Sequence, residues 1–182
     1  MPYIFPLDAS KISWSSKLKE KWDVTSFRSA GQMRKAIVRQ DRPLWTFSIA
    51  FPQLSKSEVD ELLAFHAARR GSWQPFMYKD FERYAVIGKT LEQDASMRYI
   101  ATIPFGGYEE PAAYIDHVRL WVDGQRSNDF TVSGGLISTT ATGEEIKFDY
   151  EYYFKVVFAD QISINQIFYD LYSVGLTLEV VQ

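Results

Sequence analysis

The residue types that carry most enzymatic and metal chemistry are sparse in this sequence. It contains no cysteine, which excludes disulfides, thiolate catalysis and cysteine-type zinc sites. Its two histidines, His66 and His117, stand in no metal-binding spacing. We interpret His66 as a partly buried residue of an apolar helix face and His117 as an ordinary strand residue. The sequence therefore predicts no metal site and no cofactor.

Three further patterns approach catalytic motifs without completing them. Gly88-Lys89-Thr90 has the form of the end of a phosphate-binding loop, but Arg83 stands where that loop requires a glycine. The acidic pairs Glu109-Glu110 and Glu144-Glu145 would suit a glycosidase, yet adjacent residues of a strand point to opposite faces. No G-x-S-x-G elbow is present. We predict that the protein is not an enzyme; a hydrolase, the third interpretation, would require two acids on converging strands.

Composition narrows the class further. The 182 residues predict one domain, 1–182, and 16% of them are aromatic, which is typical of β-structure or of a contact-rich surface. A net charge of −3 and a pI near 5.4 argue against general binding to nucleic acids or membrane surfaces. No apolar run approaches the roughly 18 residues of a membrane span, and we expect no signal peptide.

One helix is expected, over about 55–70, and it carries signals at both ends. Ser55 and Glu58 form a capping-box pattern, and Gly71 follows the last turn as a left-handed cap. The apolar stripe that should face a sheet contains Val59, Leu62, Leu63 and His66.

The rest of the chain reads as strands and turns. The best strands alternate strictly, over 45–51 and over 147–158, and the second is long enough to serve two sheets. Asp123-Gly124 predicts a two-residue hairpin turn after 118–122, whereas 105–111 reads as a loop. Residues 1–22 are either an arm that reaches a neighbour or a first strand with a loop. From 24 to 51 two strands are expected, joined by a turn at Asp41-Arg42-Pro43, of which 45–51 is the second. Shorter strands are expected at 85–87, 99–103, 130–132, 136–137 and 176–180.

Large aromatic residues in and beside the expected turns are the candidate contact residues. Such side chains either stack on sugars or anchor protein interfaces. The candidates for contacts with other subunits or partners are Trp73, Phe76, Tyr108, Trp121 and Tyr153. From the residues alone, the chain is a non-catalytic β-rich module for binding or assembly.

The order of segments resembles the distal tail proteins of long-tailed bacteriophages and gene transfer agents. The helix phrase that ends Phe65-His66-Ala67-Ala68-Arg69-Arg70-Gly71 is similar to the family's F-x-A-R-x-G, and it leads into a phenylalanine-bearing strand and Asp80. The segment from Val118 to Gly124 matches a later V-x-V-D-G hairpin, and the end of the chain, 178–181, is similar to a terminal L-x-E-V. Residues 156–160 echo the closing V-R-F-D-x-D phrase without its arginine and first aspartate.

This resemblance implies a mainly β protein with one principal helix (α+β): a tail-tube-like β-sandwich or barrel with long hairpins, in which 81–146 elaborates the tube fold. It implies a hexameric ring that connects the tail tube to the baseplate hub. DNA would pass through the channel of the ring without being specifically bound, and no membrane is involved. The location implied is the tail tip of a virion, assembled in the host cytoplasm. The alternative is a carbohydrate-binding β-sandwich module of a phage tail or receptor-binding apparatus, which would show two or three coplanar aromatics on a concave face.

Overall fold

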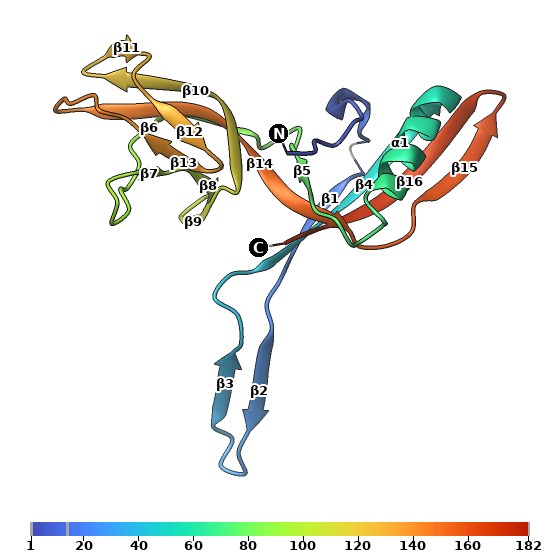
Figure 1. Ribbon diagram of the computed structural model, residues 1–182. Coiled ribbons are helices and arrows are strands. Elements are labelled where there is room, and N and C mark those ends of the chain that lie inside the picture. Colours follow the sequence, from blue (N-terminus) through green and yellow to red (C-terminus); the bar gives the residue numbers. More distant parts are fainter. Residues whose placement is uncertain (1, 14, 182) are drawn as a thin grey trace. The chain divides into compact units, whose positions relative to one another are not determined.

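A computed structural model describes residues 2–13 and 15–181, and the chain divides into two compact units (Figure 1). Of the described residues, unit 1 contains 2–5 and 76–155, and unit 2 contains 6–13, 15–75 and 156–181. Strands dominate, and the described residues contain a single α-helix. The predicted class, mainly β with one principal helix, is confirmed. No helix in the described ranges has the length and apolarity that crossing a membrane demands.

Unit 2 is built on an antiparallel sheet in the order β1 (Lys17–Lys21), β4 (Leu44–Ser55), β16 (Leu171–Val180). Strand β15 (Ser163–Phe168) pairs with one part of β16, and the last residues of β14 (Ile146–Phe158) pair with another. A 3-10 turn, η1 (Ala9–Lys11), precedes β1. Alternate residues of β4 are buried, as the sequence predicted, and form the core of this sheet: Trp45, Phe47, Ile49 and Phe51.

The helix α1 (Lys56–Ala68) lies where the capping signals placed it. Its capping box forms, and the Ser55 amide donates to Glu58 Oε2 at 3.0 Å. Val59 and Leu62 are buried, but Leu63 is 41% exposed, so the buried stripe is narrower than expected. At the far end, Phe65 and His66 bring their rings against Phe158 of β14, with centroids 6.3 and 4.7 Å apart. His66 is therefore a packing residue of the helix–sheet contact.

The helix ends in a Schellman motif that begins one residue earlier than the glycine signal suggested. The Gly71 amide donates to the His66 carbonyl and the Arg70 amide to the Ala67 carbonyl, which is the bonding pattern of that motif. Arg70 takes the first left-handed position, with φ of +54°, and Gly71 follows at +61°. A non-glycine residue therefore occupies a left-handed position in which glycine would have the lowest conformational energy.

Unit 2 also contains the hairpin of β2 (Val24–Arg28) and β3 (Arg34–Val38), whose strands run side by side (Figure 1). These two strands pair with each other and, within the described part of the chain, with no third strand. Every residue of both strands is exposed. This hairpin therefore lies outside the core of the unit.

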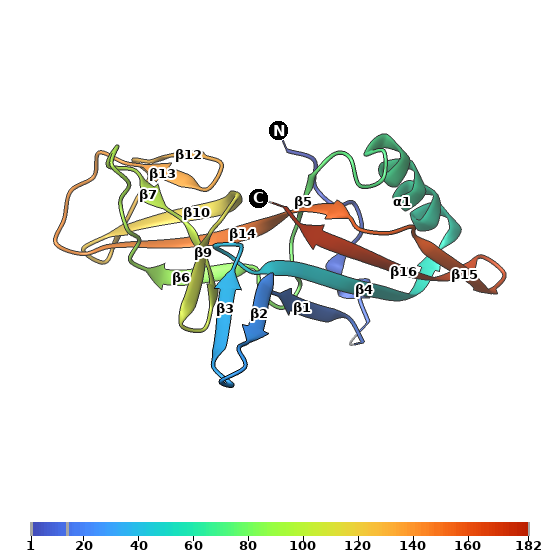
Figure 2. The ribbon, with the colours of Figure 1, turned by 90° about the horizontal axis from the view of Figure 1, so that it is seen from below.

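Unit 1 is organised around the first ten residues of β14, with β10 (Tyr114–Val122) on one side of it and β6 (Ala85–Lys89) on the other (Figure 2). Strand β5 (Phe76–Tyr78) also pairs with β14, and β11 (Gln125–Ser127) extends the sheet beyond β10. A second, three-stranded sheet has the order β12 (Thr131–Ser133), β13 (Leu136–Ser138), β7 (Tyr99–Ile100). The predicted long strand is confirmed, and it pairs within both units, because its last three residues join β16.

Two segments of unit 1 test the turns and loops that the sequence predicted. Asp123 and Gly124 both have positive φ, +50° and +79°, as the predicted two-residue hairpin turn requires. The loop expected over 105–111 is wrong: β8 (Thr102–Phe105) and β9 (Tyr108–Pro111) form a hairpin around a two-glycine turn. The glycines close the turn and the residues on either side pair as strands, so the loop signal was limited to the turn itself.

The core of unit 1 comes from the inward face of β14 and the elements over it. Phe148, Tyr150, Tyr152 and Phe154 are all buried on this face. The Tyr150 hydroxyl donates to the Thr102 carbonyl at 2.7 Å and accepts from the Thr102 amide at 3.1 Å, which joins β8 to β14. A close approach occurs at Gly135, where a Cβ would lie 1.8 Å from the backbone oxygen of Ala112.

Candidate functional site

The five candidate contact aromatics do not form one surface. Trp73 is exposed in the turn after α1 in unit 2, whereas the other four belong to unit 1. Tyr108 is exposed on the β8–β9 hairpin, and Trp121 is half-buried on β10. The structure thus places Tyr108 and Trp121 on different sheets of the same unit.

The remaining two candidates are buried inside unit 1. Phe76 of β5 stacks against Phe5 with ring centroids 6.1 Å apart. Tyr153 of β14 packs edge-to-face on Tyr114 of β10 at 5.4 Å. Both rings therefore contribute to the packing of the chain itself.

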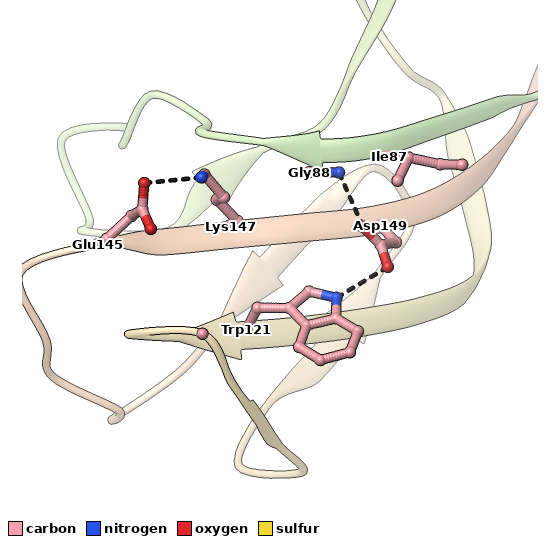
Figure 3. A pocket seen from close by; sticks show the side chains of 7 residues that line it. Ile87, Gly88, Trp121, Glu145, Lys147 and Asp149 are labelled. Atoms are coloured by element: carbon pink, nitrogen blue, oxygen red, sulfur yellow. Dashed lines mark hydrogen bonds and ion pairs between the residues drawn. The ribbon is translucent and has the colours of Figure 1, made fainter.

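A hollow of about 300 Å³ lies on unit 1 between β6, β10 and β14 (Figure 3). Its wall includes the indole of Trp121 and the carboxylate of Asp149, and the Trp121 Nε1–H donates to Asp149 Oδ2 at 2.8 Å. The Gly88 amide donates to the other carboxylate oxygen, Oδ1, also at 2.8 Å. Because separate donors hold its two oxygens, the Asp149 carboxylate is fixed in orientation.

The rim of this hollow combines charged and apolar side chains. Lys147 and Glu145 form an ion pair at 2.7 Å, and Glu145 is 58% exposed. Ile87 is 83% exposed, which is unusual for an isoleucine in a strand. Asp149 forms no ion pair with any residue that the structure describes. An aromatic face, an oriented carboxylate and an apolar rim together suit a cationic or hydroxyl-rich ligand.

Lys89 and the pair Glu109-Glu110, from the incomplete catalytic motifs, do not line this hollow. Lys89, of the incomplete phosphate loop, forms an ion pair with Glu109 and donates to the Thr102 hydroxyl at 3.0 Å. The Lys89 ammonium holds the pKa of Glu109 below its ordinary value. Glu109 is exposed while Glu110 is buried, so this pair of acids does point to opposite faces. Among the described residues, no three His, Asp or Glu side chains gather as a metal site would require.

His117, expected in an ordinary strand, lies at an irregular point of β10. Its φ is +50°, and the register between β10 and β14 shifts between Asp116 and Arg119. This is a β-bulge with a histidine in the left-handed position. The bulge sets the register that places Trp121 beside Asp149.

The β2–β3 hairpin is an exposed apolar feature of unit 2. Directly paired residues of a hairpin share a face. One face carries the pairs Val24–Val38, Ser26–Ala36 and Arg28–Arg34; the other carries Thr25–Ile37 and Phe27–Lys35. Large apolar side chains are therefore exposed on both faces of a ribbon that is only two strands wide.

This hairpin also carries a charge opposite to that of the chain as a whole. Between Lys21 and Arg42 there are six basic and two acidic residues, a net charge of +4, whereas the complete chain has −3. Arg28 and Arg34 are cross-strand neighbours at the tip. Neither arginine forms a hydrogen bond or an ion pair through its side chain within the described ranges. The tip therefore presents two unneutralised guanidinium groups.

The sequence predicted one strand before a turn at 41–43, and this was wrong, because the chain turns between Arg28 and Arg34 and forms a hairpin of its own. The exposure of both faces of this hairpin was also missed. The available signal was the mixing of apolar and basic residues on both faces of 34–39, where a half-buried strand has one polar face. A second exposed apolar tip, between β15 and β16, was also missed. It includes Phe168 and Tyr169, the latter 88% exposed.

No family model matches the sequence, and no curated protein matches it.

Proposed function

We propose that this protein is a structural component of a phage-like tail: a distal tail protein whose copies form a ring between the tail tube and the baseplate hub. The single observation that carries the proposal is the β2–β3 hairpin. An isolated two-stranded hairpin is only marginally stable in water. Its apolar side chains and unpaired edges are the features that proteins cover by assembly.

Ring symmetry offers a complete cover for such a surface. In a closed ring each copy contributes its hairpin to one neighbour and receives the hairpin of the other, so every hairpin is covered. The resemblance of the sequence to distal tail proteins supports six copies, with a tail-tube-like sandwich lining a channel. DNA crosses that channel in transit, and the net negative charge of the chain is compatible with weak attraction to phosphate.

The partners in this proposal are further copies of the chain, the tail tube protein and the hub proteins. The site of action is the tail tip of a virion assembled in the host cytoplasm. No catalytic step is assigned to any residue. The fold proposed for the assembled subunit is a tube-like sandwich in which 81–146 is an elaboration.

The test is the mass of the purified protein by light scattering, with negative-stain images, alone and with tail tube and hub proteins. We expect six-fold rings. Replacing Phe27 and Ile37 by serine should reduce assembly, because these exposed side chains are buried only between copies. The control is Val132→Ser, which removes a similarly exposed apolar side chain from β12. A strict monomer under all these conditions would overturn the proposal.

A sugar-binding module is the second candidate, and the hollow beside Trp121 is the observation that favours it. An indole face next to a carboxylate is a common arrangement for stacking and orienting a pyranose. Trp121 is, however, the one aromatic side chain among the described residues that line the hollow. A glycan array that gives a signal with the wild type, and none with Trp121→Ala, would favour this candidate.

A further inference from the structure

We propose that the hollow bounded by Trp121, Asp149 and Glu145 receives an arginine from the tip of the β2–β3 hairpin of a neighbouring copy. This inference rests on the proposed ring and names the surfaces that meet in it. The occupant is a second copy of this chain, and the recognised group is a guanidinium.

The chemistry of the hollow fits a guanidinium. Tryptophan has the aromatic face that cations prefer, and arginine stacks on it through its flat guanidinium. The Asp149 carboxylate lies beside the indole, held by donors on both oxygens, and each oxygen keeps a further lone pair. Lys147 is engaged by Glu145, which leaves Asp149 without a cationic partner among the described residues. A planar fork that stacks on Trp121 can donate to Asp149 in the same position.

The tip of the hairpin offers the matching group. Arg28 and Arg34 are directly opposite each other, and like charges in that relation are destabilising. An anionic partner relieves this repulsion, and none is provided within the described ranges. Met33, between the two strands, is 67% exposed and adds an apolar contact beside the arginines. Its counterpart on the rim of the hollow is the exposed Ile87.

The distribution of charge favours a second copy as the source. Residues 76–155, the bulk of unit 1, contain eight basic and thirteen acidic residues, a net charge of −5. Residues 21–42 carry +4. Each copy therefore contains both a cationic projection and an anionic acceptor, and this complementarity supports association between identical chains. The exposed apolar residues of the hairpin favour a protein partner over a nucleic acid.

The first test uses charge reversal. We expect Arg34→Glu to raise the concentration at which rings form by at least about tenfold, the equivalent of one lost ion pair. Glu145→Arg, at an exposed rim position, should do the same. The double variant Arg34→Glu with Glu145→Arg should recover part of the assembly, because an ion pair re-forms at the rim while Asp149 still repels the new carboxylate. The control is Arg39→Glu, which makes the same change at the base of the hairpin. Rings that form equally well with Arg34→Glu and with Arg39→Glu would overturn the inference.

The second test uses the absence of cysteine from the chain. Met33→Cys combined with Ile87→Cys should give, on mild oxidation, a ladder of disulfide-linked chains on a non-reducing gel. The pair Met33→Cys with Val132→Cys should give no ladder. If the wild type forms rings but the Met33→Cys, Ile87→Cys variant gives no ladder, this contact is overturned and the proposed function still stands. A disulfide within one chain, which runs as a monomer, would also overturn it.

A protein that stays monomeric even with tail components would overturn both proposals together. A glycan that binds the wild type and is lost with Trp121→Ala, while Arg34→Glu binds it unchanged, would assign the hollow to sugar instead.

Discussion

Removing one oxygen atom from Tyr150 should measure how β8 is held to the long strand of unit 1. Tyr150→Phe keeps the buried ring and deletes the hydroxyl that bonds both backbone groups of Thr102. Each such hydrogen bond contributes about 1 kcal/mol net, so we expect the free energy of unfolding to fall by about 2 kcal/mol. That is a large part of the roughly 5–15 kcal/mol of an ordinary domain.

The matched control is Tyr152→Phe, two residues along the same face of β14. Tyr152 is buried to a similar extent, and burial raises its pKa to about 12, but its hydroxyl makes no hydrogen bond within the described ranges. We therefore expect this change to cost less than about 0.5 kcal/mol. The assay is urea unfolding of both variants, with hydrogen exchange of the Thr102 amide to locate the effect in unit 1. Equal costs for the two variants would refute the role given to the Tyr150 hydroxyl.

Three further changes test the backbone and the charges. Gly135→Ala should lower the free energy of unfolding in urea by about 1–3 kcal/mol or more, because the added Cβ would collide with a backbone oxygen. Gly107→Ala should leave it unchanged, because a Cβ there meets no atom within 4 Å. Similar losses for the two variants would contradict the geometry. Arg70→Gly should raise the unfolding free energy by up to about 1 kcal/mol, because φ is +54° there, and Arg70→Ala should give no such gain. The pKa of Glu58 is lowered to about 2, chiefly by the hydrogen bond from Lys11, so its contribution to stability is complete above pH 4.5 and is lost as the pH falls toward 2. Lys11→Met should move the NMR titration midpoint of Glu58 up toward 4.5, and an unmoved midpoint would contradict this ion pair.

The features that sequence alone predicted are those set by local chemistry. The strands over 45–51 and 147–158 alternate strictly, and an alternating strand with one buried face is recognisable without its partners. The helix was predicted for a similar reason, because Ser55 and Glu58 satisfy backbone donors within the same turn. The turn at Asp123-Gly124 follows from the conformations those two residues tolerate.

The features that sequence missed depend on which strands pair and which side chains pack together. Glycines and a proline make 105–111 look like a loop, but pairing between β8 and β9 overrides that preference. Tyr153 lies among polar neighbours on its face of β14, and it is buried because Tyr114 of another strand packs on it.

The hollow could not be predicted from spacing. Trp121 reaches Asp149 only because β10 and β14 pair in one register, which changes at the His117 bulge. A shift of one residue would move the indole to the opposite face of the sheet. The exposure of the β2–β3 hairpin had one local signal, the mixing of apolar and basic residues over 34–39, but the strands with which it pairs could not be read from that segment.

The pairing of β4 with β16 has a consequence for the order in which the protein is made. Phe47 lies opposite Leu178, so on the order of a hundred residues are synthesised between the two halves of this contact. Throughout that interval one edge of β4 remains unpaired and its apolar face is incompletely covered. The residues of unit 1 from Phe76 to Lys155 are translated in the meantime, so their strand pairs can form earlier. The nascent chain also carries an exposed apolar hairpin in its first forty residues, so its risk of aggregation is greatest during this delay. We therefore expect chaperones to bind residues 24–55 during translation.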